Sequence, residues 1–124
     1  MAEDGIPAEL RDFIINSIDT VGQIEALLLL RADPDKAWDV SQLANRLYVN
    51  EAEAVAIVAH LVDQGFATAA EGSYRYDRGG KQTPVIDQLA EAYTRQLIPI
   101  TNLIHGKPRG IRAFADAFKI KRDK

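Results

Sequence analysis

The stretch VNEAEAVAIVAHLVDQGFATAAEGSYRYD, residues 49–77, sets the class of fold because its hydrophobic period changes from that of a helix to that of strands. Asn50 precedes Glu53 by three residues, which is the spacing of a helix-capping box, and Gly65 stands where a helix would end. After it, FATAA and SYRYD flank EG, a turn signal. The stretch therefore predicts a helix from Asn50 to Gly65 and a β-hairpin over residues 66–77.

The two faces of this helix are expected to differ. Helical spacing predicts that its core side consists of Ala54, Val55, Val58, Leu61 and Val62. Its outward side would then carry Glu51, Ala52, Glu53, Ala56, Ile57, His60, Asp63 and Gln64. Glu53 is interpreted as the acid of the capping box, and Glu51 as a first-turn acid that favours the helix dipole. Since no lysine or arginine lies between Arg46 and Arg75, the outward side offers no cation.

Upstream of this stretch, three further helices and one extended piece are predicted. Ser41 is expected to cap a short helix over residues 41–49, and the segment 37–40 before it reads as extended, with Trp38 as a core anchor. An apolar helix begins with Thr20 and Gln23 in capping-box spacing and stops at Asp33 and Pro34. A flanking helix is predicted over residues 7–18.

Downstream, a loop leads into one long helix over residues 83–105, which Pro99 is expected to kink because it lacks a backbone N–H. The tail, residues 107–124, places Ile111, Phe114 and Phe118 at helical spacing with basic residues opposite. The apolar stripe of the long helix consists of Ile86, Leu89, Tyr93, Leu97, Ile100 and Ile104.

Composition limits the function classes. With 124 residues, 47% hydrophobic and 27% charged, the chain fits one globular domain, and its longest apolar run, Ala54 to Ala59, is too short to span a membrane. It has no cysteine, which excludes disulfides and thiol nucleophiles. The acidic N-terminus lacks the features of a secretory signal, so a cytoplasmic protein is expected.

Charge is divided unevenly along the chain. Residues 1–106 contain eight Lys/Arg against sixteen Asp/Glu, whereas residues 107–124 contain seven against two. An acidic body with a basic tail predicts that a polyanion meets the tail first.

The segment from Thr20 to Arg78 resembles a winged helix-turn-helix domain of the kind found in small bacterial MarR-like and PadR-like regulators. The blocks AWDVSQLANRL and HLVDQGFA carry the resemblance. The ending IRAFADAFKIKRDK also looks like the tail of a group of small bacterial winged-helix proteins. The resemblance implies a mainly α fold with a three-helix core and a two-stranded β-wing, DNA binding in transcription regulation, and a homodimer built by the helices over 7–18 and 83–105.

Under this hypothesis, the residues expected to contact double-stranded DNA are Arg46, His60, Arg75, Arg78 and Lys81. The dimer contacts would be the stripe Ile86, Leu89, Tyr93, Leu97, Ile100 and Ile104. The basic tail would contact phosphates or an acidic partner through Lys107, Arg109, Arg112, Lys119, Lys121 and Arg122, unless its helix docks Phe114 and Phe118 on the domain.

An alternative hypothesis is a winged helix that has become a protein-interaction module, with the uncharged or acidic helix face and Ile57 as the docking surface. An enzyme is not expected, because no Ser, His and acid arrangement is signalled. RGGK at 78–81 and HGKPRG at 105–110 lack the spacing of a phosphate-binding loop and are read as turns. His60 and His105 suggest no metal site, and no cofactor is implied.

Overall fold

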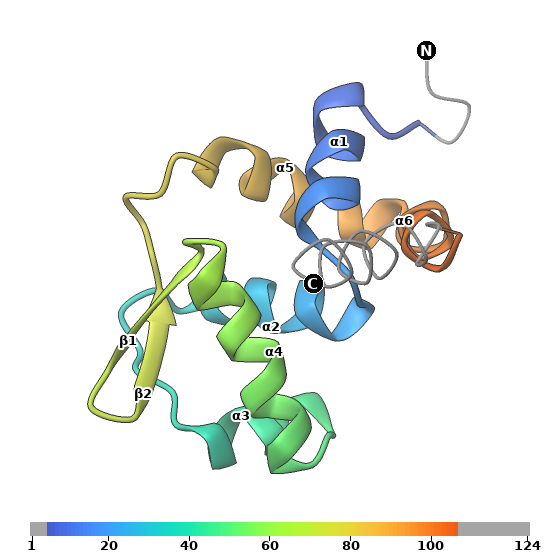
Figure 1. Cartoon of the computed structure of the whole chain (residues 1–124). Coiled ribbons are helices and arrows are strands. Elements are labelled where there is room, and N and C mark those ends of the chain that lie inside the picture. The colour runs from blue at the N-terminus through green and yellow to red at the C-terminus, as the bar shows by residue number, and fades with distance from the viewer. Residues whose placement is uncertain (1–4, 107–124) are drawn as a thin grey trace, which may run out of the picture.

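The computed structural model describes residues 5–106, which are mainly helical with one antiparallel β-hairpin (Figure 1). In Figure 1, α1, α5 and α6 lie at one end, α3, α4 and the hairpin lie at the other, and α2 lies between them. Buried side chains from every helix join one hydrophobic core. In chain order the elements are α1 Ala8–Ser17, α2 Val21–Ala32, α3 Val40–Leu47, α4 Glu51–Asp63, β1 Ala67–Ala70, β2 Ser73–Tyr76, α5 Thr83–Arg95 and α6 Leu97–His105.

The start of α3 differs from the prediction. Its cap is Asp39 and not Ser41, because the Asp39 carboxylate accepts from the Gln42 N–H at 2.8 Å and the Gln42 side chain accepts from the Asp39 N–H at 3.0 Å. This reciprocal pair satisfies two backbone donors at once, which a lone serine cannot do. The helix ends at Leu47 because Tyr48 adopts the left-handed conformation, with φ 60°.

Helix α4 begins and ends as predicted, but the residues on its buried and exposed sides differ from the prediction. Asn50 accepts from the Glu53 N–H at 2.7 Å, and Gly65 follows the helix with φ +83°. Ile57 is only 6% exposed, whereas Val55 is 47% exposed. The reason lies in α2, where Gly22 has no side chain, so the Ile57 side chain packs directly over its backbone. The expectation that Ile57 faces solvent and Val55 faces the core is therefore wrong.

The β-hairpin matches the prediction from the sequence. Ala67 pairs with Tyr76 and Ala70 with Ser73, which leaves Glu71 and Gly72 as a two-residue turn. Both turn residues have positive φ, as a type I′ turn requires. Trp38 forms a short antiparallel bridge with Tyr74 through two backbone hydrogen bonds of 2.8 Å, so the extended segment before α3 lies along the hairpin.

The long helix expected over residues 83–105 is two helices. Helix α5 ends at Arg95 and α6 begins at Leu97. In a continuous helix the N–H of residue 99 would bond to the carbonyl of Arg95, but Pro99 has no N–H and its ring crowds that carbonyl. The chain breaks at Gln96, where φ is −128° and ψ is 41°, rather than bending at Pro99 itself.

The stripe assigned to a dimer interface packs inside the molecule instead. Helices α5 and α6 both pack against α1, and this contact buries Ile86, Leu89, Ile100 and Ile104. Tyr93 is half-buried, with its hydroxyl 3.4 Å from a Glu25 carboxylate oxygen. Of the stripe, Leu97 is exposed, at 46%. A side chain buried against its own chain cannot also contact a second copy, so the prediction of a dimer through this stripe is wrong for the four core residues.

Within residues 5–106, no single helix has the length and apolar composition of a membrane span. Helices α1 and α2 meet that test only as a pair, and they are bent by 110°.

Candidate interaction surface

The exposed side of α4 is apolar along its length and acidic at its start. Its exposed apolar residues are Ala52, Val55, Ala56 and Ala59, which follow the i, i+3, i+4, i+7 spacing of one helix face. Glu51 and Glu53 are exposed in the first turn, and Asp63 is exposed at the end. The helix sequence contains neither lysine nor arginine.

Tyr48, in the turn between α3 and α4, is the most exposed large hydrophobic side chain of residues 5–106, at 94%. Its backbone is left-handed, with φ 60° and ψ 43°, and its N–H donates to the Ala44 carbonyl. For a residue other than glycine this conformation costs about 1 kcal/mol, because the Cβ crowds the following carbonyl. An exposed aromatic side chain at a strained position contributes nothing to the core. We refer to Tyr48, Ala52, Val55 and Ala56 as the Tyr48 surface.

The two glutamates of α4 have different local roles. The Ser41 hydroxyl on α3 donates a hydrogen bond of 2.5 Å to the Glu51 carboxylate. This bond links α3 and α4 at their exposed side. The Asn50 side chain accepts from the Glu53 N–H, but the Glu53 carboxylate does not return a bond to the Asn50 N–H. Only half of the predicted capping box is therefore formed, and the Glu53 carboxylate is exposed to solvent.

The cations proposed to contact DNA lie in different local settings. Arg46 is exposed on α3, and its guanidinium carbon lies 5.6 Å from the centre of the Trp38 ring. Arg75 is exposed on β2. The Arg78 guanidinium forms an exposed ion pair with the Asp35 carboxylate at 3.5 Å.

Lys36 completes the group around Trp38, since its ammonium lies 4.4 Å from the ring centre. Sequence reasoning missed Lys36, although its position two residues before the tryptophan was visible. The buried Trp38 ring thus holds two cations beside the hairpin.

His60 lies where α4 meets the end of α1. Its Nε2 donates to the Ser17 carbonyl oxygen at 2.6 Å, and the side chain is half-buried between α4 and the end of α1. This hydrogen bond satisfies a helix-terminal carbonyl and gives His60 a role in packing α4 against α1. Its contact with DNA stays a prediction.

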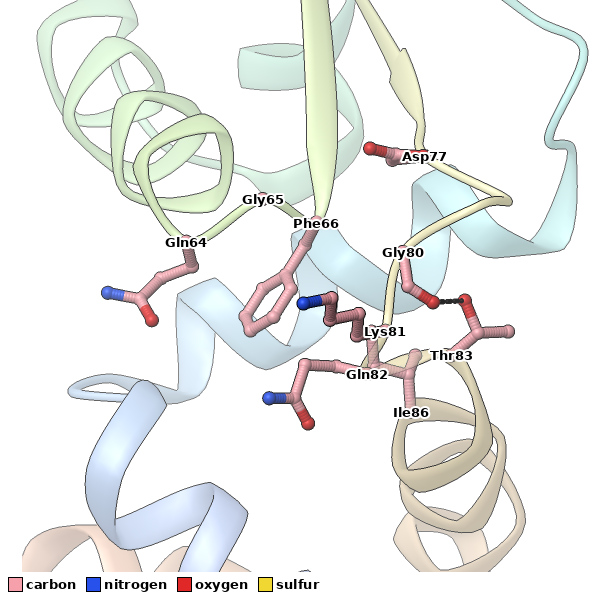
Figure 2. A pocket seen from close by; sticks show the side chains of 9 residues that line it. All are labelled: Gln64, Gly65, Phe66, Asp77, Gly80, Lys81, Gln82, Thr83 and Ile86. Carbon is pink, nitrogen blue, oxygen red and sulfur yellow. Dashed lines mark hydrogen bonds between the residues drawn. The ribbon is translucent and has the colours of Figure 1, made fainter.

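A pocket opens beside Lys81, the last of the proposed DNA contacts. Figure 2 shows the side chains of Gln64, Phe66, Lys81 and Gln82 around one space, which has a volume of about 280 Å³. Thr83 closes one edge by donating to the Gly80 carbonyl at 2.8 Å. The pocket lies where the end of α4, the base of the hairpin and the start of α5 meet.

A second depression, which we call the α1–α5 groove, has a volume of about 230 Å³. Gln82 lines both it and the pocket of Figure 2. Its full lining is Glu9, Asp12, Phe13, Asn16, Ser17, Gln82 and Val85.

The segment RGGK at 78–81 forms a turn, as predicted. In RGGK, the Gly79 N–H donates to the Asp77 carboxylate at 3.0 Å, which closes the chain after β2. His105 is exposed at the end of α6. Among residues 5–106, no group of three or more His, Asp or Glu side chains is arranged to hold a metal ion. The tail residues Lys107, Arg109, Arg112, Lys119, Lys121 and Arg122 lie outside the described residues.

The buried Tyr76 and the half-buried Tyr93 have altered acidity. Burial raises the pKa of Tyr76, and the Asp87 carboxylate raises it further. Burial also raises the pKa of Tyr93, with Glu25 as the second cause. Both hydroxyls are neutral at physiological pH and take no part in the exposed surfaces described above.

Comparison of the chain with protein-family models, curated proteins and solved structures finds no match in any of the three.

Proposed function

We propose that the segment from Thr20 to Arg78 is a winged helix that serves as a protein-interaction module. The order of elements supports this proposal: α2, the extended Trp38, α3, a short turn, α4 and the hairpin follow one another as the parts of a winged helix do. Helix α4 then holds the position of the recognition helix, which in DNA-binding members of this fold enters the major groove.

The observation that carries the function is the Tyr48 surface. Three exposed apolar side chains on α4 adjoin a turn that holds an aromatic ring in water at a strained backbone position. Strained residues that the core does not need are typical of functional sites. Because Glu51 and Glu53 lie beside the apolar residues, the partner that fits is a protein segment with an apolar face bordered by lysine or arginine.

The same surface is a poor match for nucleic acid. DNA affinity rests on neutralising phosphates, and the start of a recognition helix enters the major groove between the two phosphate backbones. Here that start carries Glu51 and Glu53. Over residues 33–81 the chain has five Lys/Arg against eight Asp/Glu, and one of those cations, Arg78, is already paired.

A DNA-binding regulator is the second candidate, and two exposed cations favour it. Arg46 lies over the Trp38 ring, Trp38 is bonded to Tyr74, and Arg75 follows Tyr74 on β2. Cations on both sides of this bridge could contact a phosphate backbone that passes α3 and the hairpin. With so few contacts, binding would require low salt, because affinity falls with log salt by roughly 0.9 per phosphate.

One experiment separates the two candidates. A displayed library of short peptides is selected on the immobilised full chain, and the enriched peptides are measured against the wild type, Tyr48→Gly and Val55→Asp. The matched control is Ala69→Asp, which places a charge on an exposed β1 residue outside the Tyr48 surface. The proposal expects that the enriched peptides have an apolar face with flanking Lys/Arg. These peptides should bind Tyr48→Gly and Val55→Asp at least about tenfold more weakly than they bind the control.

Random-sequence duplex DNA at low salt is titrated in parallel. Binding that survives Tyr48→Gly and Val55→Asp but is lost in the double variant Arg46→Ala, Arg75→Ala would replace the interaction module with the DNA-binding candidate. Peptides that bind Tyr48→Gly, Val55→Asp and the control equally well would also overturn the proposal.

A further inference from the structure

We propose that the α1–α5 groove is the docking site of the chain's own C-terminal segment, residues 107–124. This inference is independent of the proposed function, because the groove and the Tyr48 surface share no residue.

The groove has two apolar residues at its base and polar residues, two of them acidic, around them. Phe13 and Val85 are buried beneath it, and the Phe13 ring lies 5.3 Å from the ring of Phe66 in the core. Glu9 and Asp12 are exposed one turn apart on α1. Among the described residues that line it, none is lysine or arginine. Such a groove suits an apolar side chain carried on a basic segment.

The C-terminal segment has that chemistry in its sequence. It contains seven Lys/Arg against two Asp/Glu, whereas the rest of the chain has an excess of acids. Ile111, Phe114 and Phe118 recur at the spacing of one helix face, and the basic residues stand at other positions. The groove and the basic segment are therefore complementary both in charge and in apolar content.

The attachment point of the segment also favours this groove. The segment follows Gly106, directly after α6, and α6 packs against α1, the helix that carries Glu9 and Asp12. Eighteen residues can extend up to about 60 Å, while a folded body of this size has a radius of gyration of only about 13 Å. Reach is thus not limiting, and the covalent link gives the segment a local concentration on the order of millimolar.

Weak contacts suffice at that concentration. Partial burial of one phenylalanine side chain favours docking, and exposed ion pairs with Glu9 and Asp12 add a smaller contribution. The ion pairs are screened by salt, so docking is expected to weaken as ionic strength rises.

The test uses the full chain and the absence of native cysteine. The variant Asp116→Cys provides a unique site for a spin label within the segment, and amide signals of the ¹⁵N-labelled protein are compared with the label active and reduced. The proposal expects the strongest broadening at residues 9–17 and 82–85. The double variant Glu9→Lys, Asp12→Lys should abolish it, while Glu51→Lys, Glu53→Lys, with the same change of charge on α4, should not.

Trp38 fluorescence reports whether each variant is folded, since this single tryptophan is buried. A Phe114→Ala, Phe118→Ala variant removes two apolar side chains of the segment without changing any of residues 5–106, and it too should lose the broadening. Broadening centred on α4, or none at all, would overturn the proposal. In a further control, spin-labelled protein without ¹⁵N is mixed with ¹⁵N-labelled protein that carries no spin label. Broadening that appears only in this mixture would also overturn the proposal, because the groove would then hold the segment of a second copy.

Discussion

His60 on α4 and Ser17 at the end of α1 are joined by a hydrogen bond of 2.6 Å from the imidazole Nε2 to the backbone carbonyl oxygen. This bond ties α4 to the helix on which α5 and α6 pack. It also satisfies one of the carbonyls that the last turn of a helix leaves without an intrahelical partner.

We expect His60→Ala to lower the free energy of unfolding by about 1–2 kcal/mol, because the half-buried Ser17 carbonyl loses its partner. Urea unfolding followed by Trp38 fluorescence measures the change. His105→Ala, at an exposed position on α6, is the matched control and should shift the midpoint little. Equal effects of the two substitutions would show that the bond does not contribute to stability.

Tyr48→Gly is expected to raise the free energy of unfolding by about 1 kcal/mol, because glycine adopts the left-handed conformation without strain. The lost side chain is 94% exposed, so no packing is lost with it. Asn45→Gly, in the right-handed interior of α3, should do the opposite and destabilise by about 0.3 kcal/mol, the difference between the two residues in helix propensity. The two midpoints in urea decide the matter, and a destabilised Tyr48→Gly variant would contradict the account of strain.

Ile57 and Val55 are two residues apart on α4 but are expected to respond differently to truncation. Ile57→Ala should destabilise by about 2–5 kcal/mol, since it leaves a cavity against α2. Val55→Ala should change stability by less than about 0.5 kcal/mol. Thermal unfolding of the two variants tests which side of α4 is buried. A larger loss of stability in Val55→Ala than in Ile57→Ala would contradict the burial of Ile57.

Tyr76 should make stability depend on pH in the alkaline range. Its folded-state pKa lies above the ordinary value of about 10, so the neutral hydroxyl favours the native state. The contribution is complete below about pH 10 and is lost as the pH rises through the folded-state pKa. Tyr76→Phe is therefore expected to show a smaller loss of stability between about pH 8 and about pH 11 than the wild type.

At about pH 8 the same Tyr76→Phe variant should lose no more than about 1 kcal/mol, because it keeps the buried ring and gives up only the interaction of the hydroxyl with the Thr83 side chain. Tyr48→Phe, which alters an exposed tyrosine, controls for general alkaline effects. Parallel loss of stability with pH in the wild type and Tyr76→Phe would exclude Tyr76 as the cause.

The sequence alone determined those parts of the protein whose causes lie within a few residues. The Asn50 cap, the end of α4 at Gly65 and the two-residue turn at Glu71 and Gly72 all follow from local backbone chemistry, and all are present. The break before Pro99 is also local in cause, but whether a proline bends a helix or divides it depends on how each half packs.

Only the tertiary structure decided which faces were used. Ile57 is buried because Gly22, thirty-five residues away in sequence, leaves room over α2, and Val55 is exposed as a result. The stripe from Ile86 to Ile104 is apolar enough for a dimer interface, yet α1 covers most of it within one chain. Hydrophobic spacing specifies that a face must be buried but not against what, because the hydrophobic effect has no direction. The packing of elements that are distant in sequence decides which element covers each apolar face, and it therefore also decides that the Tyr48 surface is exposed.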